Sequence, residues 1–158
     1  MAVKVAINGF GRIGRLAFRQ MFGAEGFEIV AINDLTSPEM LAHLLKYDST
    51  QGRYELADKV SYGEDSITVD GKEIKIYAKA NAAELPWGEI GVDVVLECTG
   101  FYTSKAKAQA HIDAGAKHVI ISAPAGHDLP TTVYNVHHQT LSQDVHIIPP
   151  STSTHKCQ

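Results

Sequence analysis

The chain has 158 residues, and 14 Lys and Arg against 18 Asp and Glu give it a formal net charge of −4. A length of roughly 150 residues corresponds to one domain, and 44% hydrophobic residues suffice for a buried core, which excludes a disordered chain. The acidic balance argues against nucleic acid and membrane surfaces as partners, and no apolar run approaches the roughly 20 residues of a spanning helix.

The first part of the chain alternates between strand-like and helix-like segments. Val3–Asn8 and Phe27–Asn33 are short runs rich in β-branched residues, which predicts two strands. Apolar residues between them recur at helical spacing over 13–21. Ser37 and Pro38 then suit the start of a second helix, because proline is tolerated in the first turn.

The middle of the chain has a different pattern, with short strands flanked by polar residues. Val60–Tyr62, Ser66–Asp70 and Glu73–Tyr77 are the candidates, and Asp70-Gly71 is a strong hairpin signal between the last two. We expect this section to form a small antiparallel insertion at the periphery of the main sheet.

Continuous apolar runs return in the second half, as expected for strands that are covered on both faces. Asp93–Glu97 and His118–Ser122 are two such runs, and Ser104–Gly115 between them predicts a helix with a glycine at its C-terminal cap. Val133–Val136 and Val145–Ile148 are further short strand candidates. The alternation predicts an α/β fold with a Rossmann-type, doubly wound and mostly parallel sheet.

A glycine-rich turn lies between the first predicted strand and helix. Gly9, Gly11 and Gly14 form GxGxxG, in which the glycines serve the tight turn, the approach of a pyrophosphate and helix packing. Asp34 follows about 20 residues later, where a carboxylate binds the ribose 2′-hydroxyl and repels a 2′-phosphate. The motif therefore predicts NAD rather than NADP as the cofactor. A plain turn and an exposed strand end are the alternative interpretation.

Five motifs in one order resemble the cofactor-binding half of the phosphorylating glyceraldehyde-3-phosphate dehydrogenases. They are Val5–Arg15, Ala31–Asp34, Lys46–Ser49, Glu97–Gly100 and Ile120–Pro124, and the resemblance extends from residue 3 to about residue 148. It implies cofactor contacts from the following residues: Asn8, Gly9, Phe10, Gly11, Arg12, Ile13, Asn33, Asp34, Thr99, Gly100 and Ser122. Thr99, Gly100 and Ser122 are expected to line the path toward the nicotinamide.

The resemblance also implies a reaction, in which a cysteine thiolate attacks the aldehyde, hydride passes to NAD, and phosphate releases 1,3-bisphosphoglycerate. The phosphorylated aldehyde is a partner only of the full-length enzyme, which the resemblance implies is a cytoplasmic homotetramer of glycolysis. The two cysteines, Cys98 and Cys157, form no CxxC motif or disulfide framework, which agrees with a reducing compartment.

The end of the chain departs from the family pattern. Residues 152–157 align with the family signature Ser-Cys-Thr-Thr-Asn-Cys, and Ser153 takes the place of the nucleophilic cysteine. A serine hydroxyl is far less acidic than a thiol, so we expect no intact catalytic residue. We therefore expect an NAD-binding domain over 1–148 and a degenerate start of the catalytic domain over 149–158, with the remainder absent.

Two other readings remain open from the residues alone. One is a free-standing NAD-binding module or pseudoenzyme, and the other is a related two-domain NAD oxidoreductase of the homoserine or aspartate-semialdehyde type. No metal site is expected, because His127, His137, His138, His146 and His155 lack converging spacing. Cys98 ends an apolar strand and is expected to be a buried, non-catalytic thiol.

Overall fold

The computed structural model describes residues 1–123 and 146–148. Within these residues, one sheet has eight strands in the order β10-β9-β8-β1-β2-β7-β6-β5. Its strands are β1 (Val3–Asn8), β2 (Phe27–Asn33), β5 (Val60–Tyr62), β6 (Ser66–Val69), β7 (Lys72–Tyr77), β8 (Val94–Glu97), β9 (His118–Ile121) and β10 (Ile147–Ile148). The strands from β10 to β7 run parallel, and β6 and β5 continue the sheet antiparallel.

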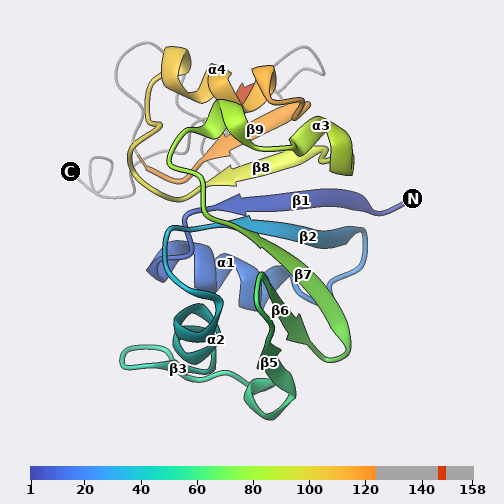
Figure 1. Cartoon of the computed structure of the whole chain (residues 1–158), viewed down its shortest axis with the longest axis vertical. Coiled ribbons are helices and arrows are strands. Elements are labelled where there is room, and N and C mark those ends of the chain that lie inside the picture. Colours follow the sequence, from blue (N-terminus) through green and yellow to red (C-terminus); the bar gives the residue numbers. More distant parts are fainter. Residues whose placement is uncertain (124–145, 149–158) are drawn as a thin grey trace, which may run out of the picture.

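Helices cover both faces of this sheet (Figure 1). They are α1 (Arg12–Met21), α2 (Pro38–Lys46), α3 (Trp87–Ile90) and α4 (Lys105–Asp113), with 3-10 turns η1 (Ala57–Lys59) and η2 (Ala82–Glu84). The core on one face contains Phe18 of α1 and Leu41 and Leu45 of α2. The core on the other face contains Trp87 of α3 and Ala108 of α4. This three-layer arrangement confirms the predicted doubly wound α/β fold.

The strand order reverses direction at β1. From β1 the chain moves to β2 and β7 on one side and returns to β8, β9 and β10 on the other. Adjacent helices depart to opposite faces at such a point, so ligands of open α/β sheets bind there, beyond the carboxyl ends of the strands. In Figure 1 the carboxyl ends of β1, β2 and β8 lie together at the left of the sheet.

The antiparallel section predicted from the sequence is present, and it continues the main sheet. β7 pairs in parallel with β2, and β6 and β5 then add antiparallel strands outside it. Asp70 and Gly71 have φ values of 49° and 81°, which fit the hairpin turn that this dipeptide predicts. The insertion therefore forms one edge of the sheet.

Capping residues set the ends of α2 and α4 where the sequence predicts them. The Ser37 hydroxyl accepts a hydrogen bond from the backbone N–H of Met40, and the Ser104 hydroxyl accepts one from Lys107. Gly115, with φ of 110°, directly follows the C-cap of α4. The sequence did not predict two short features, namely α3 and a separate antiparallel ribbon of β3 (Tyr47–Asp48) with β4 (Gly52–Arg53).

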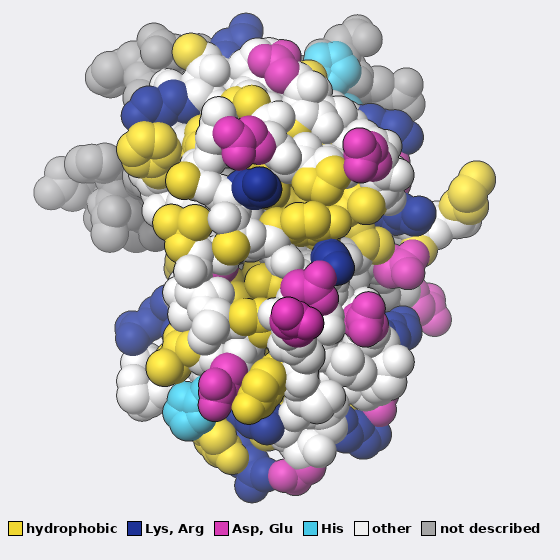
Figure 2. Space-filling model, in the orientation of Figure 1, with side chains coloured by type: hydrophobic (Ala, Val, Ile, Leu, Met, Phe, Trp, Pro, Cys, Tyr) yellow, Lys and Arg dark blue, Asp and Glu magenta, His cyan; other side chains and the backbone are white. Residues whose placement is uncertain are grey.

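One face of the molecule carries a band of hydrophobic side chains with charged groups of both signs around it (Figure 2). Val30 and Tyr77 of β2 and β7 are partly buried against the second core.

Within residues 1–123 and 146–148, no helix has the length and apolar character needed to cross a membrane.

Candidate functional site

A cavity of about 520 Å³ lies at the point where the strand order reverses. Three segments contribute its walls: the end of β1 with the glycine-rich turn, the ends of β2 and β7, and the turn after β8. The lining residues are Asn8, Gly9, Gly11, Asn33, Asp34, Leu35, Lys79, Ala80, Cys98, Thr99, Phe101 and Tyr102. The volume suits a ligand of cofactor size.

The three glycines of the turn differ in the space around the position that a Cβ atom would take. Gly9 has φ of 90°, and a Cβ there would lie 2.7 Å from Thr99 Cγ2 and 2.8 Å from the Thr99 nitrogen. A Cβ on Gly14 would lie 2.2 Å from the Gly9 carbonyl oxygen, so Gly14 allows α1 to pack against the turn. Gly11 has open space around its Cβ position and lines the cavity. A ligand can therefore approach the backbone most closely at Gly11.

Helix α1 begins directly after Gly11. Gly11 is the N-cap, and no side chain of the described residues caps the helix there. The first backbone N–H groups of a helix lack intrahelical acceptors and carry the positive end of the helix dipole. The cavity therefore has a site for a phosphate at one end.

Asp34 lies beside the glycine-rich turn that precedes this helix, and backbone donors fix its carboxylate. Oδ2 accepts a hydrogen bond from the Phe10 N–H at 2.8 Å, and Oδ1 accepts one from the Thr36 N–H at 2.9 Å. Each oxygen retains a further lone pair. The carboxylate is thus oriented and still able to accept hydrogen bonds from a ligand hydroxyl.

A row of polar side chains crosses the carboxyl ends of three neighbouring strands at the cavity. Parallel pairing aligns Asn8 with both Asn33 and Glu97, the final residues of β1, β2 and β8. The Asn33 amide donates to Asn8 Oδ1 at 2.7 Å, and the Asn8 amide donates to Glu97 Oε2 at 2.6 Å. The strand register therefore explains how residues distant in sequence reach one site.

Six residues of the predicted cofactor set line the cavity together: Asn8, Gly9, Gly11, Asn33, Asp34 and Thr99. Gly100 follows Thr99 with φ of 74° and is exposed. Ser122 is exposed at the end of β9, where its N–H donates to the Glu97 carbonyl at 2.9 Å. Gly100 and Ser122 lie beside the lining residues rather than among them.

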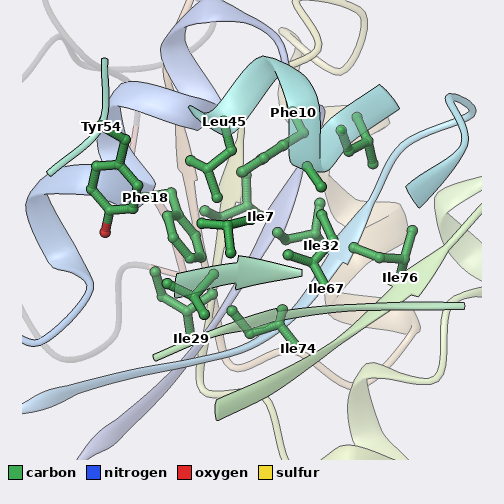
Figure 3. Packing of buried hydrophobic residues seen from close by; sticks show 14 of the residues in the cluster. Ile7, Phe10, Phe18, Ile29, Ile32, Leu45, Tyr54, Ile67, Ile74 and Ile76 are labelled. Atoms are coloured by element: carbon green, nitrogen blue, oxygen red, sulfur yellow. The ribbon is translucent and has the colours of Figure 1, made fainter. Parts of the chain in front are cut away.

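The remaining members of the set contribute through the backbone or lie outside the cavity lining. The Phe10 ring points into the first core, where it meets Phe18 edge-on (Figure 3). Only the Phe10 backbone reaches the site, through its hydrogen bond to Asp34. Arg12 and Ile13 occupy the exposed first turn of α1.

Several lining residues were missed by sequence reasoning. Leu35 and Phe101 are 70% and 63% exposed although both are large and hydrophobic, and both line the cavity. Lys79, Ala80 and Tyr102 also contribute. The available signal was their position shortly after a predicted strand, because Leu35 comes soon after β2 and Phe101 lies in the turn after β8.

Cys98 faces this cavity as a protonated thiol. Burial raises the pKa of Cys98 to about 11, a hydrogen bond with Ser122 lowers the pKa by less than burial raises it, and the Glu97 carboxylate adds the smallest, raising effect. The thiolate is the reactive form, so a raised pKa makes the side chain inert at neutral pH.

We expect iodoacetamide to alkylate Cys98 about 100-fold more slowly at pH 8 than an unhindered thiol. Cys157→Ser leaves Cys98 as the sole thiol for this measurement by mass spectrometry. The rate is expected to rise about tenfold per pH unit up to pH 10, because the thiolate fraction rises in that proportion. Alkylation at pH 8 as fast as in the urea-unfolded chain would contradict the assignment.

The site defines a dinucleotide-binding domain of the Rossmann class. Its cavity lies where the strand order reverses, a glycine-rich turn precedes α1, and the carboxylate of Asp34 is held in place after β2. Comparison with known proteins identifies the family. Residues 3–105 match the family described as glyceraldehyde 3-phosphate dehydrogenase, NAD binding domain. The chain belongs to the glyceraldehyde-3-phosphate dehydrogenase family, and its cofactor is NAD.

Relatives support this assignment across nearly the whole chain. Glyceraldehyde-3-phosphate dehydrogenase of Clostridium pasteurianum is 56% identical over 154 residues, 98% of this chain and 46% of the relative. The protein of that name from Lactobacillus delbrueckii subsp. bulgaricus is 58% identical over 159 residues, with the same shares covered. The Clostridium acetobutylicum protein is 54% identical over 154 residues, again with these shares. The chain thus spans about half the length of these curated relatives.

The family assignment sets aside the homoserine and aspartate-semialdehyde type dehydrogenases. No group of three or more metal-ligating side chains converges within residues 1–123 and 146–148. Two parts of the sequence-based prediction lie outside the described residues: the strand expected at Val133–Val136, and the segment 149–158 with Ser153. The same holds for four of the five histidines named above, His127, His137, His138 and His155.

Proposed function

We propose that the cavity binds NAD with its pyrophosphate at the N-terminus of α1 and its adenine-side ribose at Asp34. The proposed contacts are Asn8, Gly9, Phe10, Gly11, Arg12, Ile13, Asn33, Asp34, Thr99, Gly100 and Ser122, with Phe10 acting through its backbone. The observation that carries this pose is the Asp34 carboxylate, which the N–H groups of Phe10 and Thr36 hold beside the uncapped N-terminus of α1.

The adenine ring is assigned to the outer part of the cavity. Leu35 follows Asp34 directly, and Phe101 lines the cavity from the turn after β8. Both expose apolar surface, and a flat aromatic ligand gains stacking and burial between such side chains. Lys107 lies over the Phe101 ring with its Nζ 4.4 Å from the centroid, which holds the ring from the side of α4.

Replacing Phe101 with alanine is expected to raise the dissociation constant for NAD about tenfold, since base stacking on an aromatic ring contributes roughly 1–3 kcal/mol. Phe101→Tyr retains the ring and is the matched control, with affinity close to that of the unsubstituted chain. Titration of ADP is expected to show the same loss as NAD, whereas nicotinamide mononucleotide is expected to be unaffected. Equal NAD affinity in Phe101→Ala would contradict the adenine assignment.

Calorimetric titration of the 158-residue chain tests the proposal as a whole. We expect saturable NAD binding with a dissociation constant on the order of micromolar to millimolar, and weaker binding of NADP because Asp34 opposes its 2′-phosphate. The absence of saturable heat at millimolar NAD would contradict the proposed site.

For a full-length protein with cysteine at position 153, we propose the reaction of phosphorylating glyceraldehyde-3-phosphate dehydrogenase in cytoplasmic glycolysis, carried out by a homotetramer. The names of the relatives support this activity, and residues 1–148 would supply its cofactor-binding domain. The 158-residue chain is proposed to bind NAD without oxidising the aldehyde, because Ser153 stands at the position of the nucleophilic cysteine.

A further inference from the structure

Three side chains, Trp87, Glu97 and His111, form a buried polar cluster next to the cavity without lining it. The side chains of Glu97 and His111 have no exposed surface, and Trp87 is fully buried beside them. None of the three lines the cavity. Burying a carboxylate and two nitrogen heterocycles is costly unless each polar group has a hydrogen-bond partner.

The hydrogen bonds fix the protonation pattern of His111. The Trp87 indole Nε1–H is a donor only, and it lies 3.1 Å from His111 Nδ1, which must therefore accept. The ring then carries its proton on Nε2, which donates to Glu97 Oε2 at 2.8 Å. Trp87 thus orients His111, and His111 orients Glu97.

Glu97 collects four donors on its two oxygens. Oε2 accepts from Asn8 Nδ2 at 2.6 Å and from His111 Nε2. Oε1 accepts from the Thr99 N–H at 2.8 Å and from the Thr99 hydroxyl. Asn8 and Thr99 belong to two different walls of the cavity, so one buried carboxylate holds both walls.

Further hydrogen bonds extend this network to the remaining walls. The Thr99 hydroxyl oxygen accepts from the Phe101 N–H at 3.0 Å, which places the outer wall. Asn8 accepts from Asn33, and Asn33 Oδ1 accepts from the Lys79 N–H at 2.9 Å. Every segment of the cavity wall named above is therefore connected to Glu97 through at most two side chains.

We propose that Glu97 is the positioning residue of the NAD site, with His111 and Trp87 as its support from the far side. The inference rests on the proposed NAD site. The Glu97 carboxylate, through Asn8 and Thr99, presets the spacing between the glycine-rich turn and the turn after β8. A preset cavity binds without first ordering its walls, so the network raises the population of the binding-competent state.

Glu97→Gln in the 158-residue chain is the direct test, because it removes two acceptor positions at constant shape. In either orientation the glutamine amide places its NH₂ group against two donors. We expect the NAD dissociation constant to rise about tenfold by calorimetry, since the freed walls must be ordered on binding. Trp87→Phe, which removes the indole N–H together with part of a fully buried ring, acts on Glu97 only through His111, and we expect it to raise the dissociation constant about threefold.

Val69→Ala is the matched control for general destabilisation. Val69 is fully buried in β6, away from the cavity, so it lowers stability without touching the network. We expect its NAD affinity to equal that of the unsubstituted chain, while its urea midpoint falls as in Glu97→Gln. A purely structural role for Glu97 would change the two variants alike.

The indole N–H resonance of Trp87 gives a second readout, because the chain has one tryptophan. We expect this resonance to shift with the same NAD midpoint as the calorimetric titration, and to be displaced in free Glu97→Gln. Unchanged NAD affinity in both Glu97→Gln and Trp87→Phe, with both folded, would overturn the inference. Failure of the unsubstituted chain to bind NAD would instead overturn the proposed site itself, so the two failures are distinguishable.

Discussion

Gly9→Ala is expected to abolish NAD binding and to destabilise the chain by about 4 kcal/mol. A non-glycine residue at φ of 90° is strained, and its Cβ would lie 2.7–2.9 Å from the side chain and backbone of residues 98 and 99. The turn after β8 must move to relieve this contact, which separates the cavity walls. Urea unfolding and NAD calorimetry on the same preparation measure the two effects.

Gly23→Ala separates the conformational cost from the steric cost. Gly23 has φ of 82°, close to that of Gly9, but nothing lies within 4 Å of its Cβ position. We expect Gly23→Ala to cost about 1 kcal/mol and to leave NAD binding intact. Equal losses of stability in the two variants would refute the close contact between the glycine-rich turn and Thr99.

Asp34→Ala is expected to change the preference between NAD and NADP by roughly 100-fold toward NADP. A charged acceptor for a ribose hydroxyl contributes about 1.5–3 kcal/mol, and the same carboxylate repels the 2′-phosphate of NADP. Removing it weakens NAD and strengthens NADP. Parallel titrations with the two dinucleotides measure the ratio of their dissociation constants.

Asp34→Asn is the matched control, because it removes the charge at nearly constant shape and keeps one acceptor oxygen for the Phe10 N–H, while its NH₂ group takes the place of the oxygen that accepts from Thr36. We expect it to admit NADP while retaining more NAD affinity than Asp34→Ala. An unchanged ratio in Asp34→Ala would place the adenine-side ribose away from β2.

The fold was predictable where local chemistry decides it. β-branched runs marked β1, β2, β8 and β9, and Asp70-Gly71 marked the turn between β6 and β7. The four residues of α3 are too few to show a helical period, and the strands of the β3–β4 ribbon have two residues each. The pairing of β7 with β2 is a long-range contact that neither segment encodes alone.

The site was predictable where a motif carries its own chemistry. GxGxxG and Asp34 have fixed spacing, so the sequence located the turn and the acid that the structure places at one cavity. Glu97 appeared as the polar end of an apolar strand and as the first residue of the motif Glu97–Gly100, and no role was assigned to it. Its partners Trp87 and His111 come from α3 and α4, and their convergence depends on packing of both helices against the sheet.

Backbone amide chemical shifts during an NAD titration test the central claim most directly. We expect saturable changes centred on Gly11, Asp34, Thr99 and Phe101, with one midpoint. A second cavity of about 300 Å³, lined by Met21, Phe22, Phe27 and Lys72 among others, serves as an internal comparison. Changes centred there, or no saturable changes at millimolar NAD, would contradict the placement of the cofactor at the reversal point of the sheet.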